Sequence, residues 1–454
     1  MMRGRGPWVL ALALGACGAG NDIRIELERP DVEALDPYAP EAGVAKVRLV
    51  VRGDERGEEA IVDAAPGSDL LEVRGFPAER VEVEVFGFDE VGNVRAYGRL
   101  SRRAADGGLR ARVPFRRNLA YFIHAPNPSQ DAPEGVIYVL DVVTRTLVDR
   151  VRLAGSAPRA TSVSARGGRS MLVTVTEGFD ARLVELSTFD HTMTSIDLDV
   201  RPDVVLGVEA TDLAVAIGGS RVAFVDLEAG RQLDGSIDVG GRVLDAALAP
   251  SGARALAAVD VFPPGLLEID VERREVRGEN IIANPGGIAL DRRTSVAYVV
   301  STESRAIVGY DLETGRSSPV ESAPGLVASM GSPSGRAVFS DHMSGFFAVR
   351  DARDGSQPQI YPFSVLGRAG TSRGIPTFFD VRGIATDGPG RRVVAAGAGT
   401  STLTAGITVI DTELDELEPA FTNTLYPLDP DDAPGGFGQR QRYQPTGVAV
   451  IYGR

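Results

Sequence analysis

The chain has 454 residues, which is too long for one ordinary domain and predicts two or three domains. Its 43% hydrophobic and 24% charged residues exclude wholesale disorder, and its net charge of −14 argues against general binding to nucleic acid or an anionic membrane. A single Cys and three His exclude an intrachain disulfide and a Cys-based zinc or iron–sulfur site, so we expect no cofactor and no bound metal.

The chain begins with a predicted export signal over residues 1–16. Arg3 and Arg5 precede a short apolar run from Trp8 to Leu14, and small residues follow it. This order is typical of a secretory signal peptide, and the run is too short to span a bilayer as a permanent helix.

The tetrad Leu14-Gly15-Ala16-Cys17 resembles the bacterial lipobox, and it contains the only Cys of the chain. The resemblance implies that Cys17 is lipidated, so that residues 17–22 form an anchored tether; an ordinary signal peptide with a chance Cys is the alternative. Gly18 follows the Cys instead of the Asp that retains enterobacterial lipoproteins in the inner membrane. We therefore expect an exported, membrane-anchored lipoprotein, with the outer membrane favoured over the inner one.

Residues 23–116 are predicted to form a β-sandwich. Valines in the segment 80–89 fall on one face and Arg or Glu on the other, which is the period-two pattern of a half-buried strand. Seven such segments follow one another, namely 23–29, 45–53, 58–64, 70–76, 80–89, 94–100 and 109–115. Their number and spacing resemble an immunoglobulin-like or fibronectin III-like sandwich, although the Cys–Trp–Cys mark of true immunoglobulin domains is absent. We expect this domain to be a spacer or adhesion module.

Residues 117–454 repeat a strand that ends in an apolar run followed by an acid. The repeated position is occupied by Asp141, Ser187 (a degenerate member), Asp226, Asp270, Asp311, Asp351 and Asp411, with intervals of 46, 39, 44, 41, 40 and 60 residues. A period near 40 residues with four short strands each is typical of propeller blades. The fold class is therefore predicted as all-β, an N-terminal β-sandwich followed by a seven-bladed β-propeller.

The two ends of the repeat region predict how the ring closes. The segment 444–451 (QPTGVAVI) has the pattern of an innermost strand with no blade after it, and 119–124 (LAYFIH) begins at a second strand. We expect the C-terminal strand to complete the first blade and so to remove an open edge. These motifs, with AYVVST at 297–302, resemble the YVTN family of seven-bladed propellers.

Three long connections predict a site at one end of the propeller. Residues 125–135, 365–377 and 426–443 would all lie on the face that carries the loops between second and third strands, over blades 6, 7 and 1. Candidate ligand-binding residues in or beside these loops are His124, Asp341, His342, Arg368, Arg373, Arg440, Arg442 and Tyr443. Arg and His beside Tyr would suit an anionic ligand; solvated loop residues and structurally satisfied histidines are the alternative.

Other polar residues are expected to be structural or solvated. Asp429, Asp431 and Asp432 suggest calcium but lack the full twelve-residue loop with its closing Glu, so a solvated acidic loop is expected. The recurring strand-end acids are expected to stabilise each blade, and His191 is expected at the surface. No nucleophile elbow, phosphate loop or paired-His helix is present.

We therefore expect a cell-envelope lipoprotein whose propeller is a non-enzymatic binding or scaffolding platform, with no catalytic residue assigned. Its partner could be another envelope protein, a polysaccharide or a small anionic ligand, and nucleic acid is not expected. The alternative is a propeller enzyme of the lactonase or hydrolase kind with its site over blades 6, 7 and 1, because fold alone does not decide activity.

Overall fold

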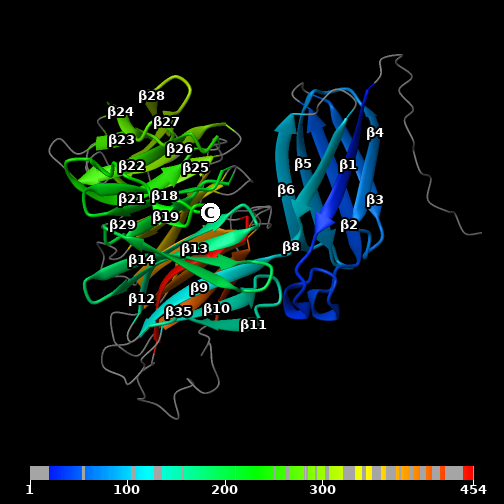
Figure 1. Ribbon diagram of the computed structural model, residues 1–454, viewed down its shortest axis with the longest axis horizontal. Coiled ribbons are helices and arrows are strands. Elements are labelled where there is room, and N and C mark those ends of the chain that lie inside the picture. Colours follow the sequence, from blue (N-terminus) through cyan, green and yellow to red (C-terminus); the bar gives the residue numbers. More distant parts are fainter. Residues whose placement is uncertain are drawn as a thin grey trace, which may run out of the picture.

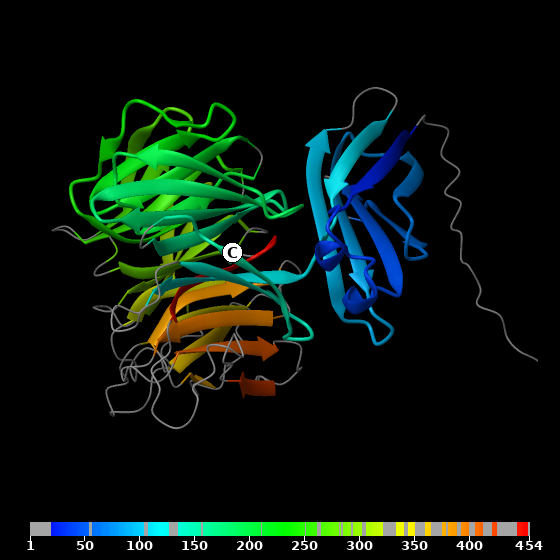
Figure 2. The ribbon, with the colours of Figure 1, turned by 60° about the horizontal axis from the view of Figure 1, so that its bottom comes forward.

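A computed structural model shows an almost entirely β protein with two parts lying side by side (Figures 1 and 2). It describes residues 20–452 except 54–56, 104–107, 127–134, 156–157, 210, 250, 261–264, 281, 283–284, 292–293, 302–305, 321–332, 340–343, 350–358, 365–374, 378–379, 388–391, 399–404, 412–419 and 425–442. Within this described chain no helix is long and apolar enough to cross a membrane. The predicted all-β propeller fold is confirmed.

The N-terminal part consists of two sheets. One has the order β4-β1-β7, with β1 (Asn21–Glu28) antiparallel to β4 (Leu70–Phe76) and parallel to β7 (Leu109–Pro114). The other has the order β3-β2-β5-β6-β8, formed by Glu59–Ala64, Lys46–Gly53, Arg80–Phe88, Val94–Arg103 and Arg116–Arg117. Two short 3-10 turns, η1 (Glu33–Leu35) and η2 (Pro40–Ala42), follow β1.

Alternation along the strands builds one apolar core between these sheets. Ile23 and Ile25 of β1 pack in the same cluster as Val83 and Val85 of β5, and all four are fully buried. The intervening residues of β5 point to the outer face of the five-stranded sheet, as a period of two requires. All seven strands predicted for this region are present, each within three residues of its predicted bounds.

The described strands after β8 form seven sheets of a propeller. The first is β11-β10-β9-β37, made of Leu147–Arg152, Val136–Asp141, Leu119–Pro126 and Tyr443–Val450. The second and third are β12 to β15 and β16 to β19 with β20, made of Arg159–Arg166, Ser170–Glu177, Asp180–Ser187, Met193–Leu198, Val204–Gly207, Leu213–Gly218, Arg221–Asp226, Arg231–Gln232 and Ile237–Asp238.

The other four sheets also run in chain order. Strands β21 to β24 are Arg242–Leu248, Arg254–Asp260, Gly265–Asp270 and Glu275–Asn280, and β25 to β28 are Pro285–Asp291, Val296–Ser301, Ala306–Asp311 and Arg316–Pro319. Strands β29 to β32 are Pro333–Phe339, Ser344–Val349, Gln359–Ser364 and Ile375–Pro376, and β33 to β36 are Asp380–Thr386, Arg392–Ala398, Ala405–Asp411 and Ala420–Thr424.

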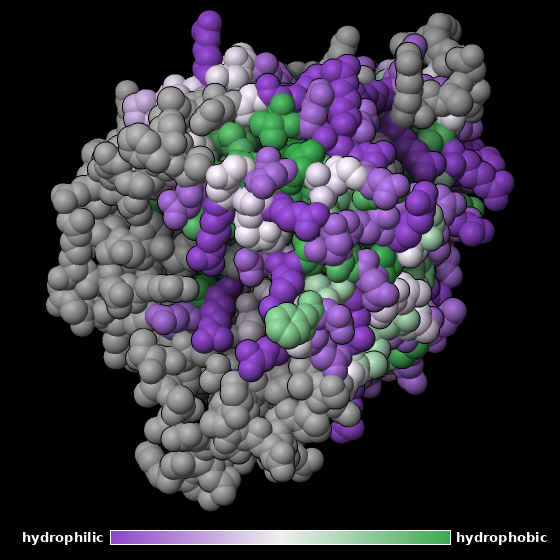
Figure 3. Space-filling view, turned by 60° about the vertical axis from the view of Figure 1, so that its left-hand side comes forward, coloured by the Kyte–Doolittle hydropathy of each residue, from purple (hydrophilic) through white to green (hydrophobic). Residues whose placement is uncertain are grey.

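The C-terminal strand closes the ring. Strand β37 pairs antiparallel with β9, which places the chain's last strand innermost in the first sheet. The innermost strands then contact one another in a closed circle, β12, β16, β21, β25, β29, β33 and β37. These strands surround a central channel, and the turns after β12, β16 and β21 supply Gly167, Glu209 and Ser251 at its end that faces the two-sheet domain. Among the described residues on the propeller side of the surface, hydrophilic ones dominate and apolar ones gather only in small groups (Figure 3).

Candidate ligand-binding site

A cavity of about 700 Å³ lies between the two-sheet domain and the propeller. Its propeller wall is built from the innermost strands β12, β16, β21, β25, β33 and β37, and its other wall comes from β2, β5, β6 and β7. Many of the wall residues are small, because the innermost strands converge on one axis. At Gly383 a Cβ atom would lie 2.5 Å from the backbone nitrogen of Val448, so the approach of β33 to β37 requires glycine.

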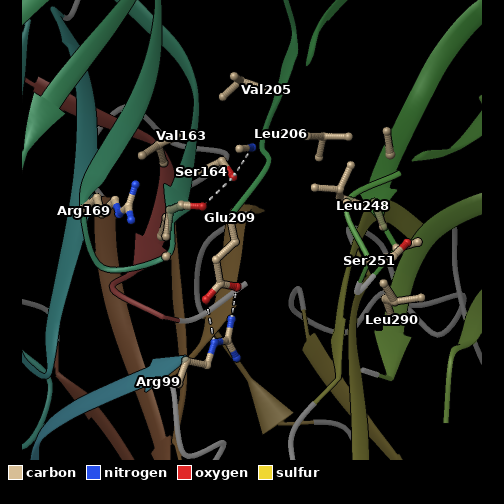
Figure 4. Close-up of a pocket in the computed structure, with 18 of the residues that line it drawn as sticks. Arg99, Val163, Ser164, Arg169, Val205, Leu206, Glu209, Leu248, Ser251 and Leu290 are labelled. Carbon is tan, nitrogen blue, oxygen red and sulfur yellow. Dashed lines mark hydrogen bonds and ion pairs between the residues drawn. The ribbon is translucent and has the colours of Figure 1, made fainter. Parts of the chain in front are cut away.

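An ion pair joins the two walls of the cavity. Arg99 of β6 donates from Nε and Nη2 to the two carboxylate oxygens of Glu209, at 2.8 and 2.6 Å (Figure 4). The same guanidinium lies 5.9 Å from the ring centroid of Tyr452, whose hydroxyl donates to the carbonyl of Pro114. The side chains of Arg99 and Glu209 are 18% and 37% exposed, so this pair remains partly in solvent.

A buried cluster of charges links the two domains. The Oδ2 atom of Asp141 accepts from Arg95 at 3.3 Å and from Arg117 at 2.8 Å, and none of the three side chains is more than 5% exposed. Arg116 lies 3.6 Å from the ring centroid of Phe189 and donates to the hydroxyl of Thr188. Because one carboxylate receives two desolvated guanidinium groups, loss of the Asp would leave uncompensated buried charge.

Apolar packing accompanies these polar contacts at the junction. Leu35, Val94 and Tyr97 of the two-sheet domain belong to the same buried cluster as propeller residues such as Tyr121 and Tyr452. The Tyr97 and Tyr452 rings meet edge to face, with centroids 5.3 Å apart. The two domains therefore share a continuous packed interface, and the cavity is a gap left within that interface.

Arginine is the main charged residue of the cavity wall. Six arginines and three carboxylates line it: Arg52, Arg80, Arg99, Arg112, Arg169 and Arg382 against Glu82, Glu209 and Asp245. Three of these arginines form ion pairs, Arg52 with Glu84, Arg99 with Glu209 and Arg112 with Glu26. In the part of the chain that the structure describes, the guanidinium groups of Arg80 and Arg169 have no ion pair or hydrogen bond.

Of the site residues predicted from the sequence, His124 has a described side chain. It is 2% exposed, its Nδ1 lies 3.2 Å from the carbonyl oxygen of Phe122, and its ring meets that of Tyr138 edge to face. Burial lowers the pKa of His124 to about 4, and its Nε2 has no partner among the described residues. His124 is therefore a neutral buried group at physiological pH.

The structure does not describe the side chains of the other predicted site residues, so their distances from His124 are not defined. Tyr443 begins β37, where its backbone pairs with Pro126, but its side chain is not described. The remaining residues lie outside the described residues, as does Cys17: Asp341, His342, Arg368, Arg373, Arg440 and Arg442. The acidic loop with Asp429, Asp431 and Asp432 lies outside them as well.

The surface position expected for His191 is wrong. Its side chain is only 7% exposed, with Nδ1 at 2.5 Å from the carboxylate of Asp149 and Nε2 at 3.1 Å from the hydroxyl of Tyr121. The backbone turns sharply at this residue, with φ of 58°, which directs the ring onto the outer strand of the neighbouring sheet. In the sequence, His191 lies in a turn before a strand, and such a position does not indicate that the side chain is buried.

Four of the recurring strand-end acids hold turns together, as predicted, while the side chains of Asp351 and Asp411 are not described. The Oδ1 atom of Asp141 accepts from the backbone N–H groups of Val143 and Thr144, at 3.0 and 2.8 Å. Asp226, Asp270 and Asp311 accept in the same way from backbone N–H groups two or three residues later. Among the described residues, no group of three or more His, Cys, Asp or Glu side chains could hold a metal ion.

The residues of this cavity were missed in the sequence. Arg80 and Arg99 alternate with apolar residues in their strands, a pattern that also describes a solvated face, and Arg169 lies in an ordinary turn before β13. Only the packing of one domain against the other places them around one space. No local signal in the sequence could have identified them.

Comparison with known proteins supports the propeller fold alone. No known protein family matches the chain, and no curated protein matches it. A solved structure from Bacteroides uniformis, described as a candidate 6-phosphogluconolactonase, aligns with a TM-score of 0.51 and 12% identity over 74% of this chain and 99% of its own. A Lactobacillus plantarum protein (TM-score 0.49, 13% identity, 74% and 99% coverage) and the β-propeller domain of Cps50 (Swd1) from Myceliophthora thermophila (0.44, 15%, 58% and 88%) are more distant.

Proposed function

We propose that this chain is an envelope lipoprotein whose propeller is a non-enzymatic platform for binding a small ligand. The observation that carries the proposal is the cavity of about 700 Å³ between the channel and the two-sheet domain. Its size lies within the roughly 300–1,000 Å³ of ordinary ligand pockets, which favour domain interfaces. The buried cluster at Asp141 supports a fixed cavity, because it holds the two walls in one arrangement.

The proposed anchor is a lipid on Cys17, with the two-sheet domain as an immunoglobulin-like or fibronectin III-like spacer. Strand β1 begins at Asn21, so only a few residues separate the proposed lipid from the folded domain. Multiple acyl chains would hold the protein more firmly than the marginal attachment that one chain gives.

The anchor is tested by the Cys17→Ser variant. We expect the parent protein in the membrane fraction and the variant in the soluble fraction, measured by immunoblotting after cell fractionation. Ser251→Ala, in a turn of the propeller, serves as a control that keeps the proposed lipid site. Membrane retention of Cys17→Ser equal to that of the parent would contradict the lipobox interpretation.

The carboxylates of the cavity support binding over hydrolysis. Asp245 accepts a hydrogen bond from the backbone N–H of Ile288 at 2.8 Å, and Glu209 is held by Arg99. A general base must reach the proton that it removes, and two of the three cavity carboxylates, Asp245 and Glu209, already accept hydrogen bonds from structural partners. The second candidate function is lactone hydrolysis over blades 6, 7 and 1, which the fold likeness to the Bacteroides uniformis protein favours.

The two functions are separated by native mass spectrometry of the full chain together with a hydrolysis assay. We expect a small molecule to be retained by the parent protein and lost from Ser251→Trp. Ser251 lies in an exposed turn of the cavity wall, so the larger indole side chain would occupy the space of the ligand. Glu228→Trp, in an exposed turn that does not line the cavity, should retain it. Hydrolysis of 6-phosphogluconolactone at a catalysed rate, with no retained ligand, would favour the enzyme instead.

A further inference from the structure

The propeller wall of the cavity presents apolar side chains from four successive sheets. Val163, Leu206, Leu248 and Leu290 belong to β12, β16, β21 and β25, and all four line the cavity (Figure 4). Val163 and Leu248 are only half-buried, so they keep apolar surface available in the channel. Covering this surface with an apolar group would remove it from water, which is favourable.

The other part of the cavity is cationic. Six arginines against three carboxylates is an excess of positive groups, although the whole chain carries a net charge of −14. Arg52, Arg99 and Arg112 pair with glutamates and Arg382 also has an interaction, whereas Arg80 and Arg169 have no partner among the described residues. Each of these two comes from a different domain, Arg80 from the start of β5 and Arg169 from the turn before β13.

Guanidinium groups bind carboxylates and phosphates through paired, charge-assisted hydrogen bonds. Because Arg80 and Arg169 line the same cavity as the four apolar side chains, the cavity presents an anion-binding part and an apolar part to one ligand. Asp245 accepts a hydrogen bond from a backbone N–H and Glu209 accepts from Arg99, so these hydrogen bonds do not involve Arg80 or Arg169.

We propose that the cavity binds a free amphiphilic anion, with a carboxylate or phosphate held by Arg80 and Arg169 and an apolar chain lying against the channel wall. The inference rests on the proposed binding function and adds the chemical class of the ligand. Binding from both domains at once would also tighten the junction, because the ligand contacts both walls of the cavity.

The test is isothermal titration calorimetry on the full chain with Cys17→Ser, which avoids detergent in the titration. The probes are decanoate, decyl phosphate, 1-decanol and acetate, all as monomers, together with phosphatidylglycerol vesicles. We expect decanoate and decyl phosphate to bind with one-to-one stoichiometry, and decanol and acetate to bind at least about tenfold more weakly.

Variants separate the two parts of the cavity. The double variant Arg80→Gln/Arg169→Gln should lower the affinity for decanoate by at least about tenfold and leave the affinity for decanol unchanged, because only the charge-assisted bonds are lost. Leu248→Asn should lower the affinity for both decanoate and decanol. Arg231→Gln, on the outer strand β19, is the matched control and should change neither. Thermal melts equal to the parent's are required for each comparison.

Several outcomes would overturn the inference. Equal affinity for decanoate and decanol would show that the carboxylate contributes nothing to binding. Equal affinity for decanoate and acetate would show that the apolar chain contributes nothing. Binding to phosphatidylglycerol vesicles but not to monomers would show attraction to a charged surface instead of a cavity ligand. Failure of every probe, while the purified protein still retains another molecule that Ser251→Trp loses, would overturn this ligand class and leave the proposed function intact.

Discussion

The inner face of the five-stranded sheet and the part of its outer face that docks on the propeller are buried by different chemistry. On the inner face, Val47, Leu49 and Val51 of β2 are fully buried in an apolar core. On the outer face of β6, Arg95 and Arg99 bind carboxylates of the propeller and Tyr97 packs on Tyr452. The inner face is covered by apolar contacts, whereas the outer face is covered where β6 docks on the propeller and remains exposed at Ile61 of β3.

The difference teaches that a polar strand face can be a domain interface. The hydroxyl of Tyr97 donates to Glu84 at 2.5 Å, and Asp141 pairs with both Arg95 and Arg117, so these buried polar groups of the docked part of the outer face have partners. Burying a charge is costly unless it is paired and hydrogen-bonded. The outer face therefore depends on particular partners, whereas the inner face depends on apolar volume.

The largest effect is expected from Asp141→Ala. The change leaves the guanidinium groups of Arg95 and Arg117 buried without their carboxylate, which should lower the free energy of unfolding by about 3–5 kcal/mol. Urea denaturation followed by circular dichroism measures it. Asp226→Ala, at the same position of a later sheet and bonded to one backbone N–H, should cost only about 1 kcal/mol. Equal losses would show that the junction gains nothing from the buried charges.

A comparable loss is expected on the inner face from Leu49→Ala. Removing a fully buried Leu from the apolar core should cost about 2–5 kcal/mol of the free energy of unfolding, again in urea. Ile61→Ala, an exposed residue of the neighbouring strand β3, is the control and should change little. A loss from Leu49→Ala no larger than that of the control would contradict the described core.

The next effect depends on pH and concerns His124. Its pKa is lowered to about 4 by burial, so between pH 6.5 and 4 the unfolded chain binds a proton that the folded chain does not. The free energy of unfolding should therefore fall by about 2 kcal/mol from pH 7 to pH 5 through this group. His124→Phe should remove that part of the pH dependence. An identical pH profile in the variant would show that His124 accepts a proton as readily in the folded state.

The smallest effect is expected from the partly exposed pair of Arg99 and Glu209. Arg99→Gln, Glu209→Gln and the double variant should show a coupling of less than about 1 kcal/mol in urea denaturation, because solvent screens the pair. A coupling as large as the loss from Asp141→Ala would mean that the exposed pair stabilises the protein as much as the buried cluster does, so that burial would not determine the energy of these ion pairs.

The sequence predicted the strands well because alternation and repeat spacing are local. The seven strands of the N-terminal domain and the pairing of the last strand with β9 follow from such patterns. The cavity did not follow, because Arg80 and Arg169 are separated along the chain and meet only through domain docking. The site predicted around His342 and Arg368 stays a prediction, since those residues lie outside the described chain.

The central claim is that the polar outer face docks on the propeller in one fixed arrangement and so forms the cavity. Small-angle X-ray scattering of the full chain with Cys17→Ser tests it most directly. We expect the profile to match the curve calculated for the two domains packed as in Figure 2, and Asp141→Ala to broaden the distribution of interatomic distances. A parent profile that requires a range of domain separations would contradict the fixed junction, and with it the cavity as a binding site.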